Sequence, residues 1–207
     1  GVGRREAIVG ALILLGCVAP GSAAADRRTT ARAAARPGLP AGYAAAVRAW
    51  HDKPKDARAP RDAEGRPVLV LANLNSRERV SAGALSDRGG FRTEDLERAA
   101  ELLRDTRTGN EHPVEPRLLD VAYRIQCRFD APELRVLSGY RTPRGPRASN
   151  HGRGRALDLI VPGASNDEVA RFARELGFVG VGVYTTSGFL HVDVRERSYF
   201  WVDGSAP

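Results

Sequence analysis

The sequence predicts an α+β fold in which helices flank a small mixed, mainly antiparallel sheet. Two observations carry this prediction. Short apolar or alternating runs that favour strands are interspersed with longer stretches whose apolar residues recur at helical spacing. These stretches do not follow a regular strand–helix–strand alternation, and no internal repeat is present, which argues against a parallel α/β sheet. With 207 residues, 42% of them hydrophobic, the chain can bury one ordinary core.

The first half of the folded region is expected to hold two strands and two helices. The stretches VLVLANLN (68–75) and RERVS (77–81) have the composition of paired strands. Thr93 is predicted to cap the first helix, and Pro116 occupies the first turn of the second, where its missing N–H costs nothing. The apolar positions at helical spacing are Leu96, Ala99, Ala100 and Leu103 in the first helix and Leu118, Leu119, Ala122, Ile125 and Phe129 in the second.

The second half begins with two more apolar runs, LRVLS (134–138) and RALDLIV (155–161), which predict strands. A third helix is expected to follow them. Ser165 and Glu168 have the spacing of a capping box at its start, and Gly177 stands where a glycine commonly ends a helix.

A hairpin is predicted next, from FVGVGVY (178–184) and GFLHVDV (188–194). Because successive side chains of a strand point to opposite faces, Phe189, His191 and Asp193 share one face of the second strand. Two polar groups that are able to bind a metal therefore lie side by side on that face.

Asp158 is the most unusual residue of the predicted strands, because it stands in an apolar run where a lone carboxylate is costly without a partner. His151 precedes it on a loop whose glycines, at 152 and 154, allow a close backbone approach. Together with His191, these residues supply two imidazoles and one carboxylate. This set suits zinc and leaves a fourth tetrahedral position for water. Such an open site predicts hydrolysis of an amide without a protein nucleophile.

Asp193 has two candidate roles, which the sequence leaves open: it accepts the proton of the attacking water, or it orients a metal ligand. Cys127 lies in a helical pattern and is interpreted as a small buried apolar residue rather than a nucleophile. His51 and His112 lie in polar, proline-containing stretches and are expected to face solvent.

The net charge of +7 is carried almost entirely by arginine, since Lys53 and Lys55 are the only lysines among 32 basic residues. We interpret this skew as compositional bias, because the arginines are scattered, without interleaved aromatic residues or a nucleic-acid-binding motif. No nucleic-acid partner and no stable protein partner are predicted. An anionic polymer such as a cell wall remains compatible with the charge.

Residues 1–25 are predicted to be an export signal. Arg4 and Arg5 precede the apolar run at 7–15, and small residues follow before Asp26, so cleavage is expected between residues 25 and 26. Export to the periplasm follows from this prediction. The apolar run is too short to be a permanent membrane anchor.

The subtype of the signal stays open between three interpretations. A plain cleaved signal is the first, and the arginine pair also resembles a twin-arginine signal. The stretch from Leu14 to Cys17 resembles a lipoprotein signal, in which a lipidated Cys17 would tether the protein to a membrane. Residues 26–66 are rich in Ala, Arg, Pro and Gly and are predicted to be a low-complexity tether, with a short helix around residues 43–50.

Several motifs resemble those of a known group of enzymes. The segment from His151 to Asp158 matches the H-x-x-G-x-A-x-D signature of zinc peptidases related to D-alanyl-D-alanine carboxypeptidases, a group that also includes lysostaphin-type enzymes and the hedgehog zinc fold. SGYRTP (138–143), LRDTRTGNEHPVEPRLLD (103–120) and GVGVYTTSGFLHVDV (180–194) resemble the exported murein endopeptidase K family. The likeness covers most of the region from 67 to 204, which is the predicted peptidase domain.

The resemblance implies a role for each matching residue. His151, Asp158 and His191 correspond to zinc ligands, Arg141 to the arginine that steadies the substrate carbonyl and its oxyanion, and Asp193 to the acid of the H-x-D element. Related enzymes place a glutamate three residues before the last histidine, where this chain has Gly188. The loop at 141–150 is also shorter than in the family, which leaves the crosslink preference open.

The resemblance therefore implies a zinc-dependent peptidoglycan endopeptidase that hydrolyses amide bonds in the peptide crosslinks of the wall. Two alternatives are a carboxypeptidase that trims terminal D-alanine and a non-catalytic zinc-bearing module that binds the wall. The presence of Arg141 and Asp193 argues against the module, because a structural zinc requires neither.

Overall fold

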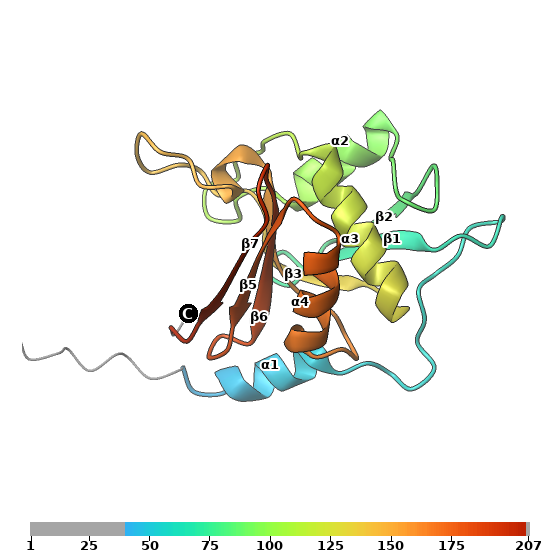
Figure 1. Cartoon of the computed structure of the whole chain (residues 1–207), viewed down its shortest axis with the longest axis horizontal. Coiled ribbons are helices and arrows are strands. Elements are labelled where there is room, and N and C mark those ends of the chain that lie inside the picture. Colours follow the sequence, from blue (N-terminus) through green and yellow to red (C-terminus); the bar gives the residue numbers. More distant parts are fainter. Residues whose placement is uncertain (1–39, 206–207) are drawn as a thin grey trace, which may run out of the picture. The chain divides into compact units, whose positions relative to one another are not determined.

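The computed structural model describes residues 40–205, which are organised around one seven-stranded mixed sheet (Figure 1). The strands are β1 (Val68–Asn73), β2 (Arg79–Gly83), β3 (Leu134–Ser138), β4 (Ala156–Ile160), β5 (Val179–Tyr184), β6 (Phe189–Val194) and β7 (Tyr199–Asp203). Their order is β2-β1-β3-β4-β6-β5-β7. The β1–β3 and β5–β7 pairs are parallel and the other pairs are antiparallel, which confirms the predicted α+β class.

The helices in the described part of the chain are α1 (Tyr43–His51), α2 (Thr93–Leu102), α3 (Pro116–Phe129), α4 (Asn166–Glu175) and the short 3₁₀ helix η1 (His151–Arg153). The capping box predicted for α4 is confirmed, with Ser165 and Glu168 each bonding the other's backbone N–H. The predicted cap of α2 is wrong. Arg92 is the N-cap, because its carbonyl accepts the first helical hydrogen bonds, and Thr93 is already helical.

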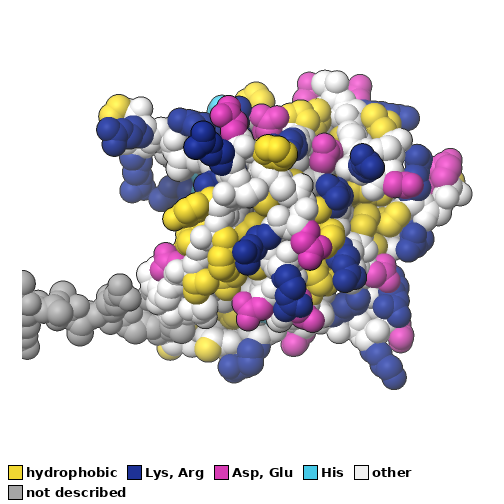
Figure 2. Space-filling model, viewed as in Figure 1, with side chains coloured by type: hydrophobic (Ala, Val, Ile, Leu, Met, Phe, Trp, Pro, Cys, Tyr) yellow, Lys and Arg dark blue, Asp and Glu magenta, His cyan; other side chains and the backbone are white. Residues whose placement is uncertain are grey.

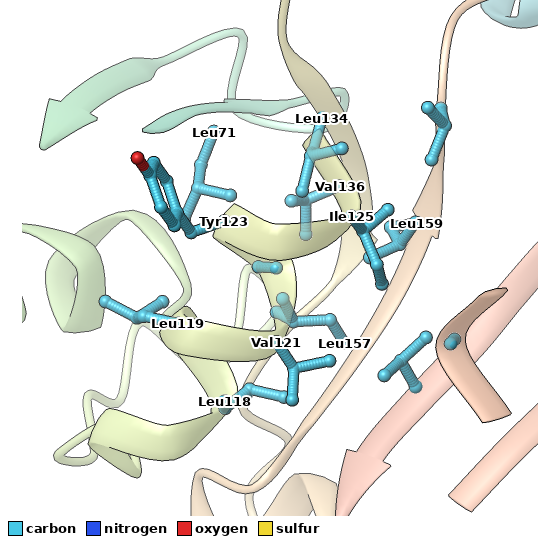
Figure 3. Packing of buried hydrophobic residues seen from close by; sticks show 14 of the residues in the cluster. Leu71, Leu118, Leu119, Val121, Tyr123, Ile125, Leu134, Val136, Leu157 and Leu159 are labelled. Carbon is cyan, nitrogen blue, oxygen red and sulfur yellow. The ribbon is translucent and has the colours of Figure 1, made fainter. Parts of the chain in front are cut away.

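The hydrophobic core lies between one face of the sheet and helices α3 and α4, and Figure 3 shows the part of it next to α3. Strand alternation positions it, because Leu157 and Leu159 of β4 point toward α3 while Asp158 between them points to the opposite face. The remaining core residues labelled in the figure are Leu71, Leu118, Leu119, Val121, Tyr123, Ile125, Leu134 and Val136. The face away from α3 is therefore the one on which polar side chains of β4 and β6 meet.

Residues 40–66, which the sequence suggested to be tether, lie against this domain. The Tyr43 hydroxyl donates to the Ser187 carbonyl at 2.8 Å, and His51 Nε2 donates to the Gly188 carbonyl at the same distance. Arg135 of β3 caps the C-terminal end of α1 by donating to the last carbonyls of the helix and to that of Asp52. The rest of the predicted tether, residues 26–39, lies outside the described residues.

The predicted export signal at residues 1–25, including Cys17, also lies outside the described residues. Between residues 40 and 205 no helix combines the length and apolar character needed to cross a membrane.

Candidate metal centre

Sheet register brings two of the predicted ligands together. Asp158 of β4 pairs directly with His191 of β6, and both side chains point to the face of the sheet opposite α3. Ser138 of β3 pairs with Asp158 from the other side. The three residues form one row across the centre of the sheet, where neighbouring strands hold each backbone in place.

His151 comes from η1, which leads into β4. Gly154 ends this short helix with φ of +64°, a conformation that strains other residues. A Cβ atom there would also lie 2.9 Å from His112 Nδ1. The glycine lets the chain turn sharply, so the imidazole of residue 151 can reach back over the row on the sheet.

The structure brings all three predicted ligands into one buried cluster, the one such group of potential metal ligands in the described chain. His191 Nδ1 lies 2.9 Å from Asp158 Oδ1, and His151 Nε2 lies 3.3 Å from the same oxygen. The two imidazole nitrogens are 3.2 Å apart. Only 5%, 3% and 7% of His151, Asp158 and His191 are exposed, so the cluster is shielded from bulk solvent.

Hydrogen bonds to groups outside the cluster determine which nitrogen of each imidazole carries the proton. His151 Nδ1 lies 2.7 Å from the Gly139 carbonyl, which can only accept, so this nitrogen donates. His191 Nε2 lies 2.9 Å from the Asp193 carboxylate and donates to it. The inward nitrogens, Nε2 of residue 151 and Nδ1 of residue 191, thus present lone pairs beside a carboxylate oxygen. Three electron-pair donors converging in this way fit a cation, and the N/N/O set suits zinc.

The electrostatics of the cluster also favour a positive charge. Burial alone would lower the pKa of His191, but hydrogen bonds to Asp158 and Asp193 outweigh it and raise that pKa above its ordinary value. Burial would raise the pKa of Asp158, yet the two histidines hold it well below its usual range. A carboxylate that stays anionic beside an imidazole whose pKa is raised marks a site where a metal ion can take the place of a proton.

Asp193 lies behind His191, on the side away from the cluster. It is 1% exposed, and Arg195 donates to both of its oxygens, with Nε at 2.6 Å from Oδ1. Burial would raise the pKa of Asp193, but the hydrogen bonds from His191 and Arg195 lower it, so the group is anionic. This carboxylate–histidine pair fixes the orientation of the ring.

Two glycines of β5 make room for the groups that cover His191. The Arg195 side chain crosses over Gly180, and the indole of Trp201 crosses over Gly182 to lie with its ring centroid 5.1 Å from that of the imidazole. A Cβ atom at position 182 would lie 2.6 Å from the indole Nε1. Trp201 therefore reaches the cluster only because its neighbour on β5 lacks a side chain.

We expect Gly182→Ala to destabilise the protein by about 1–3 kcal/mol, because the new methyl group displaces Trp201 from His191. Gly83→Ala on β2 is the matched control, since a Cβ atom there meets nothing within 4 Å. Urea unfolding of the two variants measures the difference. Equal unfolding free energies would show that the contact between Trp201 and the β5 backbone does not constrain the fold.

Arg141 lies at the opposite side of the cluster. Its Nε donates to Ser138 Oγ at 2.7 Å, and its Nη2 donates to Asp158 Oδ2, the oxygen that faces away from the histidines. The side chain is 44% exposed, so its remaining N–H groups can reach a ligand in solvent. A cation in this position can stabilise negative charge that develops next to the cluster.

Other residues singled out in the sequence lie outside the cluster. Gly188 lies in the turn before β6, against Val47 of α1, so the position offers no carboxylate to the site. Cys127 is half-buried in α3, and burial raises the pKa of its thiol, which disfavours a nucleophilic role. His51 and His112 are both only partly exposed, and His112 stacks on Tyr140 with a centroid distance of 5.0 Å.

Arg195 and Trp201 are the residues of the site that the sequence analysis missed. A signal existed for Arg195, because strand alternation continued from His191 and Asp193 places it on the same side. No local signal existed for Trp201, which reaches the site only through the parallel pairing of β7 with β5.

A family comparison agrees with this geometry. Residues 61–199 match the peptidase M15 family described as peptidoglycan L,D-endopeptidase MepK. The chain belongs to this family. The matched region contains all five predicted site residues, from Arg141 to Asp193, and the resemblance noted in the sequence is confirmed. Family membership and the His/Asp/His cluster together indicate a metal-dependent peptidase.

Curated relatives of the chain carry the family name. The probable peptidoglycan L,D-endopeptidase MepK of Haemophilus influenzae is 34% identical over 139 residues, which cover 61% of this chain and 74% of the relative. The peptidoglycan L,D-endopeptidase MepK of Escherichia coli K12 is 29% identical over 145 residues, covering 64% and 79% respectively. No solved structure matches the chain, so the predicted likeness to the hedgehog and D-Ala-D-Ala peptidase fold stays a prediction.

Proposed function

We propose that this protein is a zinc-dependent peptidoglycan L,D-endopeptidase that hydrolyses amide bonds in the peptide crosslinks of the cell wall. The observation that carries the proposal is the convergence of His151 Nε2, Asp158 Oδ1 and His191 Nδ1 in a chain of the MepK family. The protein is a peptidase, and peptidoglycan is the substrate named for the family and for the curated relatives.

The three converging atoms would hold the zinc ion, leaving a position for water or substrate. When bound there, zinc supplies Lewis-acid polarisation of a substrate carbonyl and lowers the pKa of water toward neutrality. The Gly139 carbonyl and the Asp193 carboxylate keep the two imidazoles in the tautomers that the metal requires.

Arg141 and Asp193 are assigned different tasks. The Arg141 guanidinium, anchored on Ser138 and Asp158, would donate to the oxyanion that forms on the substrate carbonyl. For Asp193 we favour positioning over proton transfer, because His191 and Arg195 already occupy both of its oxygens. Its buried, paired carboxylate holds the His191 Nε2 proton and with it the ring.

Digestion of purified sacculi tests the proposed function. Mass spectrometry of the products should show loss of crosslinked dimers with an L,D linkage, inhibition by EDTA and recovery after zinc is added. Pentapeptide monomers in the same digest report on the carboxypeptidase alternative, which would remove their terminal D-alanine. Binding to sacculi without release of any muropeptide would contradict the proposal and support a non-catalytic module.

We also propose that the protein is exported to the periplasm, where this substrate lies. The motif at residues 1–25 supports this location, with Cys17 lipidation as one of its variants. The N-terminus of the mature protein tests it: a chain that begins near Asp26 agrees with a plain signal, whereas one that begins at acylated Cys17 shows a membrane tether. An uncleaved chain in the cytoplasm would overturn the proposal.

A further inference from the structure

The segment that joins β3 to β4 has an unusual charge. Residues 139–155, here called the arginine loop, contain five arginines and neither aspartate nor glutamate. The arginines are Arg141, Arg144, Arg147, Arg153 and Arg155, and all five are exposed. The segment that carries His151 is therefore also the source of a strong positive potential at the surface.

Three of these arginines have no partner within the described part of the protein. Arg141 binds Asp158, and Arg155 lies 3.5 Å from the Glu115 carboxylate. Arg144, Arg147 and Arg153 form no side-chain hydrogen bond or ion pair with any residue between 40 and 205. Three guanidinium groups thus remain in solvent, where they are free to bind a ligand.

The arginine loop projects from the body of the domain next to the cluster. Figure 1 shows it as the orange segment extending beyond the sheet, and Figure 2 shows Lys and Arg side chains gathered over it. Its base is packed, because a Cβ atom at Gly152 would lie 3.0 Å from Pro143 Cγ. Pro143 and Pro146 restrict the backbone between Arg141 and His151, so the loop presents its charges from a fixed base.

The positive surface continues into a groove of about 630 Å³. Arg153 and Arg155 line it, together with His112, Glu115 and Gly152. Since Gly152 directly follows His151 in η1, the groove adjoins the segment that carries the His151 imidazole. An extended anionic chain lying along the loop and this groove would pass next to Gly152, the neighbour of His151 in η1.

We propose that the arginine loop binds carboxylates of the peptidoglycan polymer that surround the crosslink being cut. This inference rests on the proposed function. Intact peptidoglycan presents many stem-peptide carboxylates at once, so several weak guanidinium–carboxylate contacts add up on the polymer. A soluble dimer presents few of them. The loop therefore increases affinity for the intact wall and contributes little to cleavage of a small fragment.

Co-sedimentation with purified sacculi tests this surface. The double variant Arg144→Gln/Arg147→Gln should bind sacculi about fivefold more weakly than wild type, and the difference should shrink at high salt. Arg88→Gln/Arg124→Gln is the matched control, because it removes the same charge from exposed arginines outside the loop. Both double variants should cleave a soluble crosslinked dimer at the wild-type rate.

Three results would overturn the inference. If both double variants bound sacculi more weakly than wild type by the same factor, net charge would explain the binding and the loop would have no specific role. Undiminished binding of wild type to sacculi whose carboxylates have been amidated would exclude carboxylates as the ligand. Loop-dependent binding to phosphatidylglycerol vesicles, without loop-dependent binding to sacculi, would assign the loop to a membrane. Failure of the proposed function is distinct, because it appears as wild type that binds sacculi but cleaves no dimer.

Discussion

His151→Ala is expected to abolish both metal binding and hydrolysis. The substitution leaves Asp158 and His191 as the remaining protein ligands and leaves the Gly139 carbonyl without its donor. Two ligands hold zinc far more weakly than three, and loss of Lewis-acid catalysis should lower kcat/KM on a crosslinked dimer by at least about a thousandfold. Metal content by mass spectrometry, measured on the same preparation as the rate, should fall from one ion per chain to nearly none.

His51→Gln is the control for this variant, because it also removes an imidazole but does so outside the cluster. His51 donates to the Gly188 carbonyl, a bond that a glutamine amide can replace. This variant should keep its metal and its rate. A His151→Ala protein that retained one ion per chain, or that still digested sacculi, would refute the assignment of the ligands.

Arg141→Gln is expected to lower kcat by about 10²–10³-fold while KM changes little, since the guanidinium acts on charge that develops during the reaction. The kcat of Arg141→Lys should lie between those of wild type and Arg141→Gln. An ammonium keeps the charge but cannot bind Ser138 and Asp158 at once as the planar guanidinium does. Rates should be measured with zinc in excess, so that any loosening of Asp158 as a ligand does not dominate the result.

Arg144→Gln, three residues further along the chain, is the matched control for position 141. It removes a guanidinium from the same loop without touching the cluster, so its kcat on a soluble dimer should equal that of wild type. If Arg141→Gln also matched wild type, Arg141 would be assigned to solvating the turn after β3, and the oxyanion would need another donor.

The centre of the sheet and its His/Asp/His cluster could be predicted from the sequence because local rules determine them. Strand alternation separates Asp158 from Leu157 and Leu159, and the same rule puts His191 and Asp193 on one face. The H-x-x-G-x-A-x-D pattern contains the glycine at position 154 that lets η1 turn toward the sheet. Each of these features lies within one short segment, so the order of apolar and polar residues in that segment is enough to predict which side chains are buried in the core.

Features that depend on distant segments could not be predicted. Nothing in the Ala- and Arg-rich stretch before residue 67 signals that α1 packs against the turn at Ser187 and Gly188, since one hydroxyl, one imidazole and Val47 make those contacts. β7 was missed because it forms a parallel pair with β5, and parallel pairing leaves no hairpin signal. Trp201 was missed for the same reason.

The role of Asp193 shows where a motif stops being informative. The H-x-D spacing is compatible with a proton acceptor and with an orienting carboxylate, and both are acidic residues next to a ligand. The hydrogen bonds of Arg195 occupy both oxygens of the carboxylate, and they support our proposal that Asp193 orients His191. Arg195 lies two residues beyond the H-x-D motif, so the motif alone does not reveal its contact with the Asp193 carboxylate.

Anomalous diffraction at the zinc absorption edge, from crystals of protein purified without chelator, would show whether the cluster binds zinc and through which atoms. We expect a single peak about 2.0–2.2 Å from His151 Nε2, His191 Nδ1 and Asp158 Oδ1, with a solvent molecule or substrate analogue in the fourth position. A site without metal in protein that digests sacculi, or an ion whose fourth position is closed by another side chain, would refute a catalytic zinc at this cluster.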